Sequence, residues 1–280
     1  MKAWQRGIQY AAMALAVALC VAILGGIVSG LFFLSGVLGH HRSADAGAGA
    51  SLGEVRTYTP AGSITGLELE LGAATLTIRT GDAFRLESNL TQLTVQESDG
   101  VWKIRQKQTA IFSYANDAYC HLTVPADAAL DTVKLDTGAG KVDIDTLTAA
   151  VLDFDLGAGK FRAGSLTATK EADIDGGAGQ LVIEDGSLHE LDMDMGVGKT
   201  ELTARLTGDC SLDMGVGATE LTLLGSREDY RLNIEKGVGR MTVDGDEVQD
   251  GTIIGTGAAA VKLSGGIGRV TVELCADSAE

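Results

Sequence analysis

The stretch Asp-Phe-Asp-Leu-Gly-Ala-Gly-Lys-Phe-Arg-Ala, residues 153–163, contains a unit that recurs through most of the chain. Apolar and polar residues alternate on both sides of its Gly-Ala-Gly, which is typical of strands with one buried face. Six Gly-x-Gly elements follow one another at steps of 19, 20, 19, 19 and 22 residues. Their first and second glycines are Gly138 and Gly140, Gly157 and Gly159, Gly177 and Gly179, Gly196 and Gly198, Gly215 and Gly217, and Gly237 and Gly239. A period of about 20 residues indicates a stacked repeat architecture.

Each repeat is expected to hold two short strands joined by a Gly-x-Gly corner. Glycine suits such a corner because it adopts positive φ freely and lets neighbouring backbones approach closely. One unit cannot bury its apolar face alone, but a stack of units can. We therefore predict an all-β fold, a single β-solenoid of two-strand rungs of about 20 residues each. The alternative is a sandwich of antiparallel hairpins with Gly-x-Gly as the hairpin turn, but the regular spacing favours the solenoid.

The N-terminal segment has the composition of a membrane anchor. Residues 1–7 carry Lys2 and Arg6, whereas residues 8–38 contain no charged residue. This run is longer than the ~20 residues that span a bilayer and longer than the apolar region of a cleaved signal peptide. We predict an uncleaved transmembrane signal-anchor helix at 8–39, with residues 1–7 in the cytoplasm. The chain is thus expected in the cell membrane as a single-pass protein with its C-terminal domain outside.

The rest of the chain divides by composition. Residues 40–62 are rich in Ala, Gly and Ser and are predicted to form a flexible linker. An extracytoplasmic β-repeat domain is predicted at 63–275, in which 84–130 departs from the repeat and forms an atypical N-terminal cap region. Val270–Leu274 is expected to close the far end of the stack, and 276–280 to form a tail.

Charge limits the possible partners. The 280 residues carry a net charge of −16. Such a chain repels nucleic acid and anionic lipid surfaces, but it can attract cations and basic proteins or bind neutral glycans.

Several features together resemble a known family. They are an N-terminal membrane helix, a strand pair ending at Gly81-Asp82, a strand that runs into Val124-Pro125, and tandem Asp-x-Gly-Ala-Gly-Lys units. The repeats that carry the resemblance are Asp136–Asp145, Asp155–Phe161, Asp175–Ile183 and Asp194–Leu202. Residues 63–275 look like the bacterial putative-adhesin family of β-strand repeats, whose function is unknown. The resemblance implies a solenoid-like β fold at the envelope of mainly Gram-positive bacteria, and it brings no established catalytic residues.

A carboxylate stands two residues before the first glycine in seven copies, counting the degenerate corner Gly72-Ala-Ala74: Glu70, Asp136, Asp155, Asp175, Asp194, Asp213 and Glu235. Basic residues stand three positions after that glycine at Lys141, Lys160, Lys199 and Arg240. In a stack, equivalent positions lie ~4.8 Å apart. The row is either a solvated charge ladder, partly offset by the basic column, or a set of Ca²⁺ bridges through Asp136, Asp155, Asp175, Asp194 and Asp213. We favour the solvated ladder, because calcium requires a cage of oxygens rather than a row.

The sequence offers little for catalysis. Cys120 and His121 are adjacent in a predicted strand and must face opposite sides, so they make no dyad. The glycine-rich elements match neither a dinucleotide loop nor a P-loop, and zinc-binding spacings are absent from the sequence. We therefore expect no catalytic site, no cofactor and no dedicated metal site. Cys120, Cys210 and Cys275 are expected to be thiols outside a disulfide framework.

These observations favour a non-catalytic, membrane-anchored envelope protein that acts as an adhesin-like surface interaction or scaffolding module. Candidate partners are an envelope polymer or another membrane protein, and nucleic acid is not expected. One alternative is an accessory regulator of an envelope-stress sensing system. A glycan-active β-helix enzyme is the less favoured alternative, because similar charged residues occur in nearly every repeat and no carboxylate pair stands out.

Overall fold

The structure is a computed structural model that describes residues 52–106 and 117–275. These residues belong to one compact unit, residues 48–280. The predicted cytoplasmic N-terminus 1–7, the transmembrane helix 8–39 and the tail 276–280 lie outside the described residues. Across the two described ranges, no helix has the length and hydropathy needed to cross a membrane.

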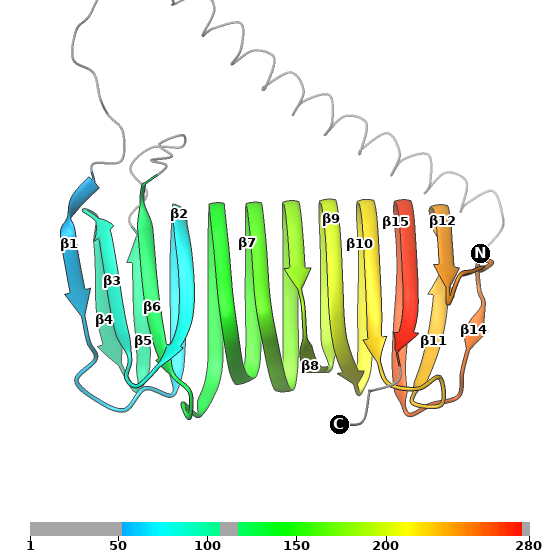
Figure 1. The fold of residues 1–280 in the computed structure, drawn as a ribbon, viewed down its shortest axis with the longest axis horizontal. Helices are drawn as coiled ribbons and strands as arrows, with labels where there is room; N and C mark the ends of the chain where they lie inside the picture. The colour runs from blue at the N-terminus through cyan, green and yellow to red at the C-terminus, as the bar shows by residue number, and fades with distance from the viewer. Residues whose placement is uncertain (1–51, 107–116, 276–280) are drawn as a thin grey trace, which may run out of the picture. The chain divides into compact units, whose positions relative to one another are not determined.

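Fifteen strands of the described residues form one continuous sheet that winds into a stack of rungs (Figure 1). They are β1 (Leu52–Tyr58), β2 (Gly66–Gly81), β3 (Arg85–Leu90), β4 (Leu93–Ser98), β5 (Val101–Gln106), β6 (Tyr119–Pro125), β7 (Leu130–Ile183), β8 (Gly186–His189), β9 (Leu191–Thr207), β10 (Asp209–Leu224), β11 (Tyr230–Glu235), β12 (Val238–Val243), β13 (Asp246–Glu247), β14 (Ile253–Ile254) and β15 (Ala259–Cys275). The strand β7 alone winds through consecutive rungs without interruption. The chain thus has an all-β, solenoid-like fold.

Parallel, in-register pairing between repeats identifies the solenoid and excludes the hairpin sandwich. Asp175 of β7 pairs with Asp194 of β9, and Asp194 pairs with Asp213 of β10. The corner glycines also pair with one another, as Gly179 does with Gly198. A sandwich of hairpins would instead pair the two strands of each repeat antiparallel, with Gly-x-Gly between them.

The core follows the predicted alternation. Phe154, Met193 and Ile234 are 1%, 0% and 0% exposed, and the residues beside them in sequence face outward. Burying one such side chain stabilises the fold by roughly 1.5–3 kcal/mol, so the continuous apolar spine holds the rungs together. Tyr230 is buried with its hydroxyl 3.3 Å from the amide nitrogen of Leu206 and 2.6 Å from the carbonyl oxygen of Leu224, which satisfies the polar end of the ring.

The far end of the stack differs from the prediction. Strand β15, which contains the predicted closing segment Val270–Leu274, lies between β10 and the pair β11 and β12. The terminal rung is therefore 230–243, although it precedes β15 in sequence. Its outer edge is covered by β14 against β11 and by β13 against β12. After β10 the chain first forms the terminal rung, and β15 then lies between that rung and β10.

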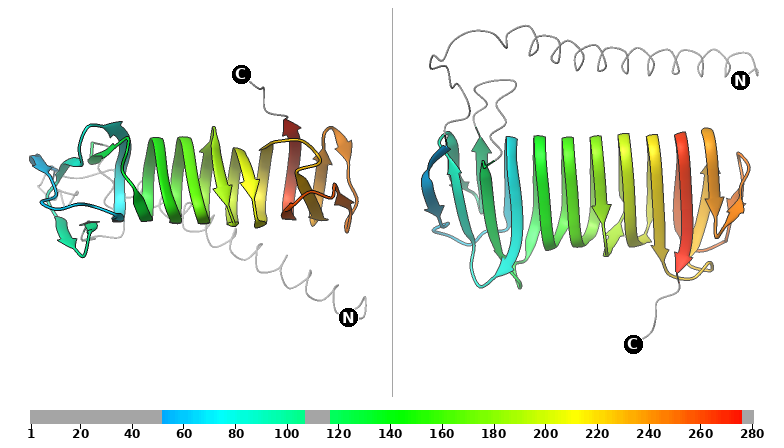
Figure 2. Two further views of the ribbon diagram at one scale, coloured as in Figure 1. Left: turned by 90° about the horizontal axis from the view of Figure 1, so that it is seen from below. Right: turned by 45° about the horizontal axis from the view of Figure 1, so that its top comes forward.

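The first part of the chain lies beyond β2 at the other end (Figure 2). Strands β5 and β6 pair with β2, and β3 and β4 pair with these in turn. The predicted flexible linker 40–62 is wrong over residues 52–58, because these form β1, which pairs antiparallel with β3. Tyr58 is aligned with Leu86, so the last residues of the supposed linker extend the sheet. Trp102 of β5 is 2% exposed and packs edge-on to Phe84 at a centroid distance of 6.3 Å.

Candidate functional site

The six predicted corners stack into one column, and the contacts show why they need glycine. A Cβ on Gly157 would stand 2.0 Å from the carbonyl oxygen of Gly138 in the preceding rung. A Cβ on Gly159 would stand 1.9 Å from the carbonyl oxygen of Gly140, and Gly159 also has φ of 146°. The first glycine is thus required by close approach alone in five of the six corners, whereas Gly237 also has a positive φ of 67°. The second is required by close approach and by a backbone conformation that L-residues rarely adopt.

The degenerate corner Gly72-Ala-Ala74 supports this explanation. It stacks on the corner of β7, where Ala74 is aligned with Gly140. On its other side β5 and β6 pair only with the arms of β2 and leave the corner itself uncovered. The side-chain oxygen of Gln106 accepts hydrogen bonds there from the amides of Gly72 and Ala73, at 3.0 and 3.4 Å. Alanine is therefore tolerated where no rung precedes the corner.

Outward side chains of the strands that lead into the corners form a surface rich in carboxylates. We call this surface the acidic face and define it by Asp153, Asp155, Asp173, Asp175, Asp192, Asp194 and Asp213. Asp173 pairs in register with Asp192, and Asp175 with Asp194, so the carboxylates form two parallel columns. Among the described residues, only Asp153 of this set forms an ion pair, with Lys134. One of these columns is evident from its fixed position before each Gly-x-Gly in the sequence, and the other lies two residues earlier in the same alternation.

Three carboxylates of the acidic face have neighbours of like charge, and their pKa values are raised. Loss of hydration raises the pKa of Asp175, and the neighbouring charges of Asp194 and Asp155 raise it further. The pKa of Asp173 and that of Asp213 are raised by the same two effects, with desolvation the larger, and the positive charge of Lys262 offsets part of the shift at Asp213. A carboxyl group whose pKa is raised in the folded state costs stability once it ionises. This face is therefore electrostatically strained at neutral pH.

An open groove of about 420 Å³ follows the acidic column nearest the corners. Asp155, Asp175, Asp194 and Asp213 line it together with corner glycines and Met195. The residues considered for calcium, Asp136, Asp155, Asp175, Asp194 and Asp213, stand in this single row. In the part of the chain that the structure describes, no group of three or more His, Cys, Asp or Glu side chains is arranged to hold a metal ion.

The basic column lies on the other side of the corners and does not offset the acidic face as predicted. Lys141 contacts Asp143 at 2.9 Å, and Lys199 contacts Glu201 at 2.8 Å, each on its own strand. The corner reverses the direction of the chain. An outward-pointing residue before the corner and one after it therefore lie on opposite sides of the rung. Within residues 52–106 and 117–275, no ion pair joins the basic column to the acidic face.

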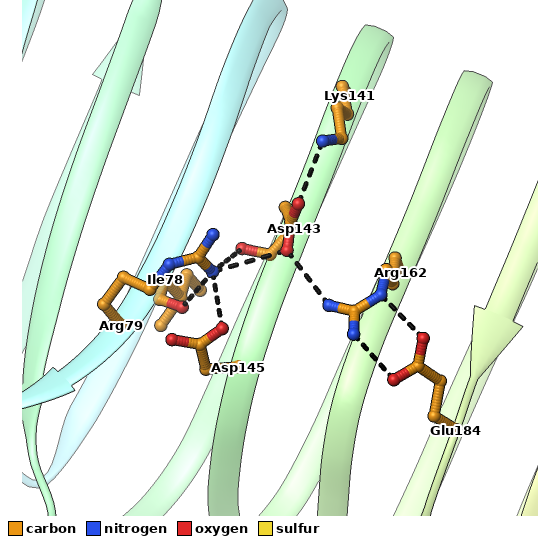
Figure 3. A network of polar contacts seen from close by, with 7 residues as sticks. All are labelled: Ile78, Arg79, Lys141, Asp143, Asp145, Arg162 and Glu184. Carbon is orange, nitrogen blue, oxygen red and sulfur yellow. Dashed lines mark hydrogen bonds and ion pairs between the residues drawn. The ribbon is translucent and has the colours of Figure 1, made fainter.

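The face beyond the corners contains a balanced charge network centred on Asp143 (Figure 3). This carboxylate contacts Lys141 at 2.9 Å, Arg79 at 3.3 Å and Arg162 at 3.4 Å. Arg162 also makes a two-pronged contact with Glu184 at 2.7 and 2.6 Å. The hydrogen bond from Lys141 is the main cause of a lowered pKa at Asp143. The two sides of the stack therefore differ, since Asp143 has three cationic neighbours, whereas in the described part of the chain the carboxylates of the acidic face have only Lys134 and Lys262 near them.

The cysteines and histidines form no reactive pair in the described residues. Cys120 is fully buried, and burial raises the pKa of its thiol to about 11. His121 is exposed on the opposite face of the same strand, as predicted, and its ring lies 4.5 Å from that of Tyr119. Cys210 is buried, Cys275 is exposed, and all three thiols are free.

The chain is similar to several known proteins. A family model described as Toastrack DUF4097 matches residues 51–264. A putative adhesin from Bacteroides fragilis NCTC 9343 has 12% identity and a TM-score of 0.42, over 78% of this chain and 95% of that one. A putative cell adhesion protein from Clostridium sporogenes ATCC 15579 has 15% identity and a TM-score of 0.36, over 79% of this chain and 98% of that one. A putative lipid binding protein from Parabacteroides distasonis ATCC 8503 has 11% identity and a TM-score of 0.32, over 82% of this chain and 96% of that one. No curated protein matches the chain.

Proposed function

The chain belongs to the toastrack family DUF4097, and on that basis we propose that it is a non-catalytic interaction module of the bacterial cell envelope. In this proposal the apolar segment 8–39 anchors it in the membrane with residues 1–7 inside. The β stack is then presented outside the cell. The module binds a partner through the acidic face, and the partner is a polycationic segment of another membrane protein or of an envelope polymer.

The observation that carries the proposal is the difference between the two sides of the stack. Asp143 has three cationic neighbours on its own side, whereas Asp173 and Asp175 have carboxylates as neighbours. A regular array of unneutralised carboxylates attracts basic partners over a distance and gains from each ion pair formed. An exposed pair contributes about 0.2–1 kcal/mol, so an affinity useful to the cell requires several pairs at once. A rigid stack with carboxylates in two columns supplies such an array.

Binding to poly-L-lysine tests the proposal with the full chain in detergent micelles. The triple variant Asp173→Asn, Asp175→Asn and Asp192→Asn should weaken binding about tenfold, because three pairs of ~0.5 kcal/mol are lost. Binding of the unsubstituted chain should also weaken steeply as the salt concentration rises.

The matched control neutralises three carboxylates on the other side of the stack: Glu201→Gln, Glu220→Gln and Glu273→Gln. This control changes the net charge by the same amount as the first triple variant. Because its three carboxylates lie outside the acidic face, its affinity should stay within about twofold of the unsubstituted chain. Equal loss in the two triple variants would show that net charge alone matters and would refute a binding role for the acidic face.

The alternative role as an accessory regulator of envelope-stress sensing predicts a different result. Deletion of the gene would change envelope-stress transcription, and replacing segment 8–39 by an unrelated membrane helix would abolish the effect. An anchored binding module tolerates that replacement. A glycan-active enzyme would lose turnover on substitution of one carboxylate, whereas members of a binding array are individually dispensable.

A further inference from the structure

The middle residues of the corners form an apolar column, of which several members are exposed. We call it the corner ridge; in spatial order it consists of Ala73, Ala139, Ala158, Ala178, Val197, Val216, Ile267 and Val238. Val197, Ile267 and Val238 are 47%, 40% and 62% exposed. Large apolar side chains repeated on successive rungs are unusual on a free surface and indicate a contact.

Opposite charges flank this ridge on the same rungs. Four rungs place a carboxylate on one side of the corner and a cation on the other: Asp136 with Lys141, Asp155 with Lys160, Asp194 with Lys199, and Glu235 with Arg240. Among the described residues these partners do not pair across the corner, and Lys160, Arg240 and Arg269 form no ion pair with any carboxylate. Arg240 and Arg269 are also aligned in neighbouring strands, where two like charges repel. The edge thus carries an acidic column, an apolar ridge and an incompletely paired basic column, side by side.

We propose that this edge is a self-complementary interface at which a second copy of the chain docks. The two-fold axis runs parallel to the ridge. A rotation of 180° about that axis brings ridge against ridge at the same height on both copies. It also places the acidic column of each copy opposite the basic column of the other, rung by rung. The groove beside Asp155, Asp175 and Asp194 then receives the basic side chains of the partner copy. Any other two-fold axis across the edge opposes like columns.

The size of the contact sets its strength. Eight rungs at ~4.8 Å give a strip about 34 Å long, and the two sides of a rung lie about 10 Å apart. The strip therefore covers roughly 340 Å² on each copy, less than half of the ~800 Å² that a stable complex buries per partner. The dimer is accordingly transient in solution, and confinement of the chains to a membrane would increase its population. An anionic bilayer suits the edge less well, since Asp194 and Asp213 lie beside the same ridge. This inference stands independently of the proposed binding to a basic partner.

Cysteine crosslinking tests the axis in membranes that contain the full chain. In a background with Cys20→Ser and Cys275→Ser, Val197→Cys lies on the proposed axis and should form a disulfide with its own copy under mild oxidation. The matched control is Val55→Cys on β1, because Val55 is 59% exposed but lies away from the ridge. Crosslinking of Val197→Cys at least fivefold above the Val55→Cys level supports the interface. Equal crosslinking of the two variants, or no crosslinking of Val197→Cys, overturns the interface. If the ridge inserts into the bilayer instead, Val197→Cys stays monomeric, which also overturns it.

A charge exchange tests the orientation independently. One variant carries Asp155→Lys and Asp194→Lys, and the other carries Lys160→Glu and Lys199→Glu, each added to the Val197→Cys background. Each variant alone opposes like charges and should lose most of its crosslinking. A mixture of the two restores opposite charges on both flanks and should recover the heterodimer. Far-ultraviolet circular dichroism confirms folding of each variant, and failure of the folded mixture to recover crosslinking refutes the proposed axis.

Discussion

Replacing Gly159 by alanine should destabilise the stack by about 4–5 kcal/mol, whereas the same change at Gly251 should cost only about 1–2 kcal/mol. Both glycines have positive φ, 146° and 77° respectively. They differ in surroundings, because a Cβ on Gly159 would stand 1.9 Å from the carbonyl oxygen of Gly140, whereas a Cβ on Gly251 meets nothing within 4 Å. The pair therefore separates the backbone cost from the steric cost.

Gly157 supplies the third measurement, since it has no positive φ but would place a Cβ 2.0 Å from the carbonyl oxygen of Gly138. That oxygen belongs to the backbone, so relief requires the rungs to separate by more than 1 Å. Overpacking costs about 1–3 kcal/mol, and a lost ladder hydrogen bond about 1 kcal/mol more. Gly157→Ala should therefore cost about 3 kcal/mol, and Gly159→Ala should cost that amount plus a backbone strain at least as large as the one measured at Gly251, because φ of 146° lies further from the left-handed region than φ of 77°.

Urea denaturation of residues 48–280, followed by circular dichroism, gives the three free energies of unfolding, and an unchanged denaturant slope would show that the states compared are the same. If Gly159→Ala and Gly251→Ala cost the same, glycine is needed at the corners for its φ alone. If Gly157→Ala costs less than about 1 kcal/mol, the rungs do not require the close approach described above. Either result would refute the steric account of the repeat.

Two aspartates should respond oppositely to the same substitution: at pH 7 and low salt Asp175→Asn should stabilise the fold by about 0.5 kcal/mol, and Asp143→Asn should destabilise it by about 1 kcal/mol. The cost of Asp175 disappears as it is protonated on acidification, and the contribution of Asp143 is lost as pH falls through its lowered pKa, so denaturation curves recorded at successively lower pH should show the difference between the two variants shrinking from its value at pH 7. Ending the chain at residue 258 removes β15 and should also release β11 and β12, which hydrogen exchange would detect; continued protection of β11 would contradict the interposed rung. A maleimide should label Cys275 rapidly and leave Cys120 unlabelled in the folded protein, as measured by peptide mass spectrometry, because the thiol of Cys120 is buried and its pKa is about 11; equal labelling would contradict the packing of β6.

The rung itself could be predicted because its determinants are local. Alternation at Phe154 and Leu156 specifies a strand with one buried face, and glycines at 157 and 159 specify a corner that stacks closely. The same reasoning predicted that Cys120 and His121 face opposite sides of one strand, and the structure shows that Cys120 is the buried one. The mixed composition before residue 63 gave no comparable signal over 52–58, because β1 is a short edge strand held by β3.

The order of the last rungs could not be predicted from the sequence. The corners at Gly237 and Gly266 belong to similar repeats, so the sequence does not show which of them stacks on Gly215. The rung of β11 and β12 lies at the end of the stack, because β13 and β14 follow it in sequence and cover an edge that would otherwise be exposed.

The amino-acid sequence alone determined that this chain forms rungs with glycine corners and an apolar core, because side-chain alternation and the backbone freedom of glycine act within a few residues. Only the tertiary structure decided which charges meet. A corner turns outward neighbours to opposite sides, so Asp155 and Lys160, five positions apart, are separated by the rung itself. Asp155 stands instead beside Asp175 of the next rung, and this long-range placement creates the acidic face of the proposed function and one of the two charge columns that flank the corner ridge.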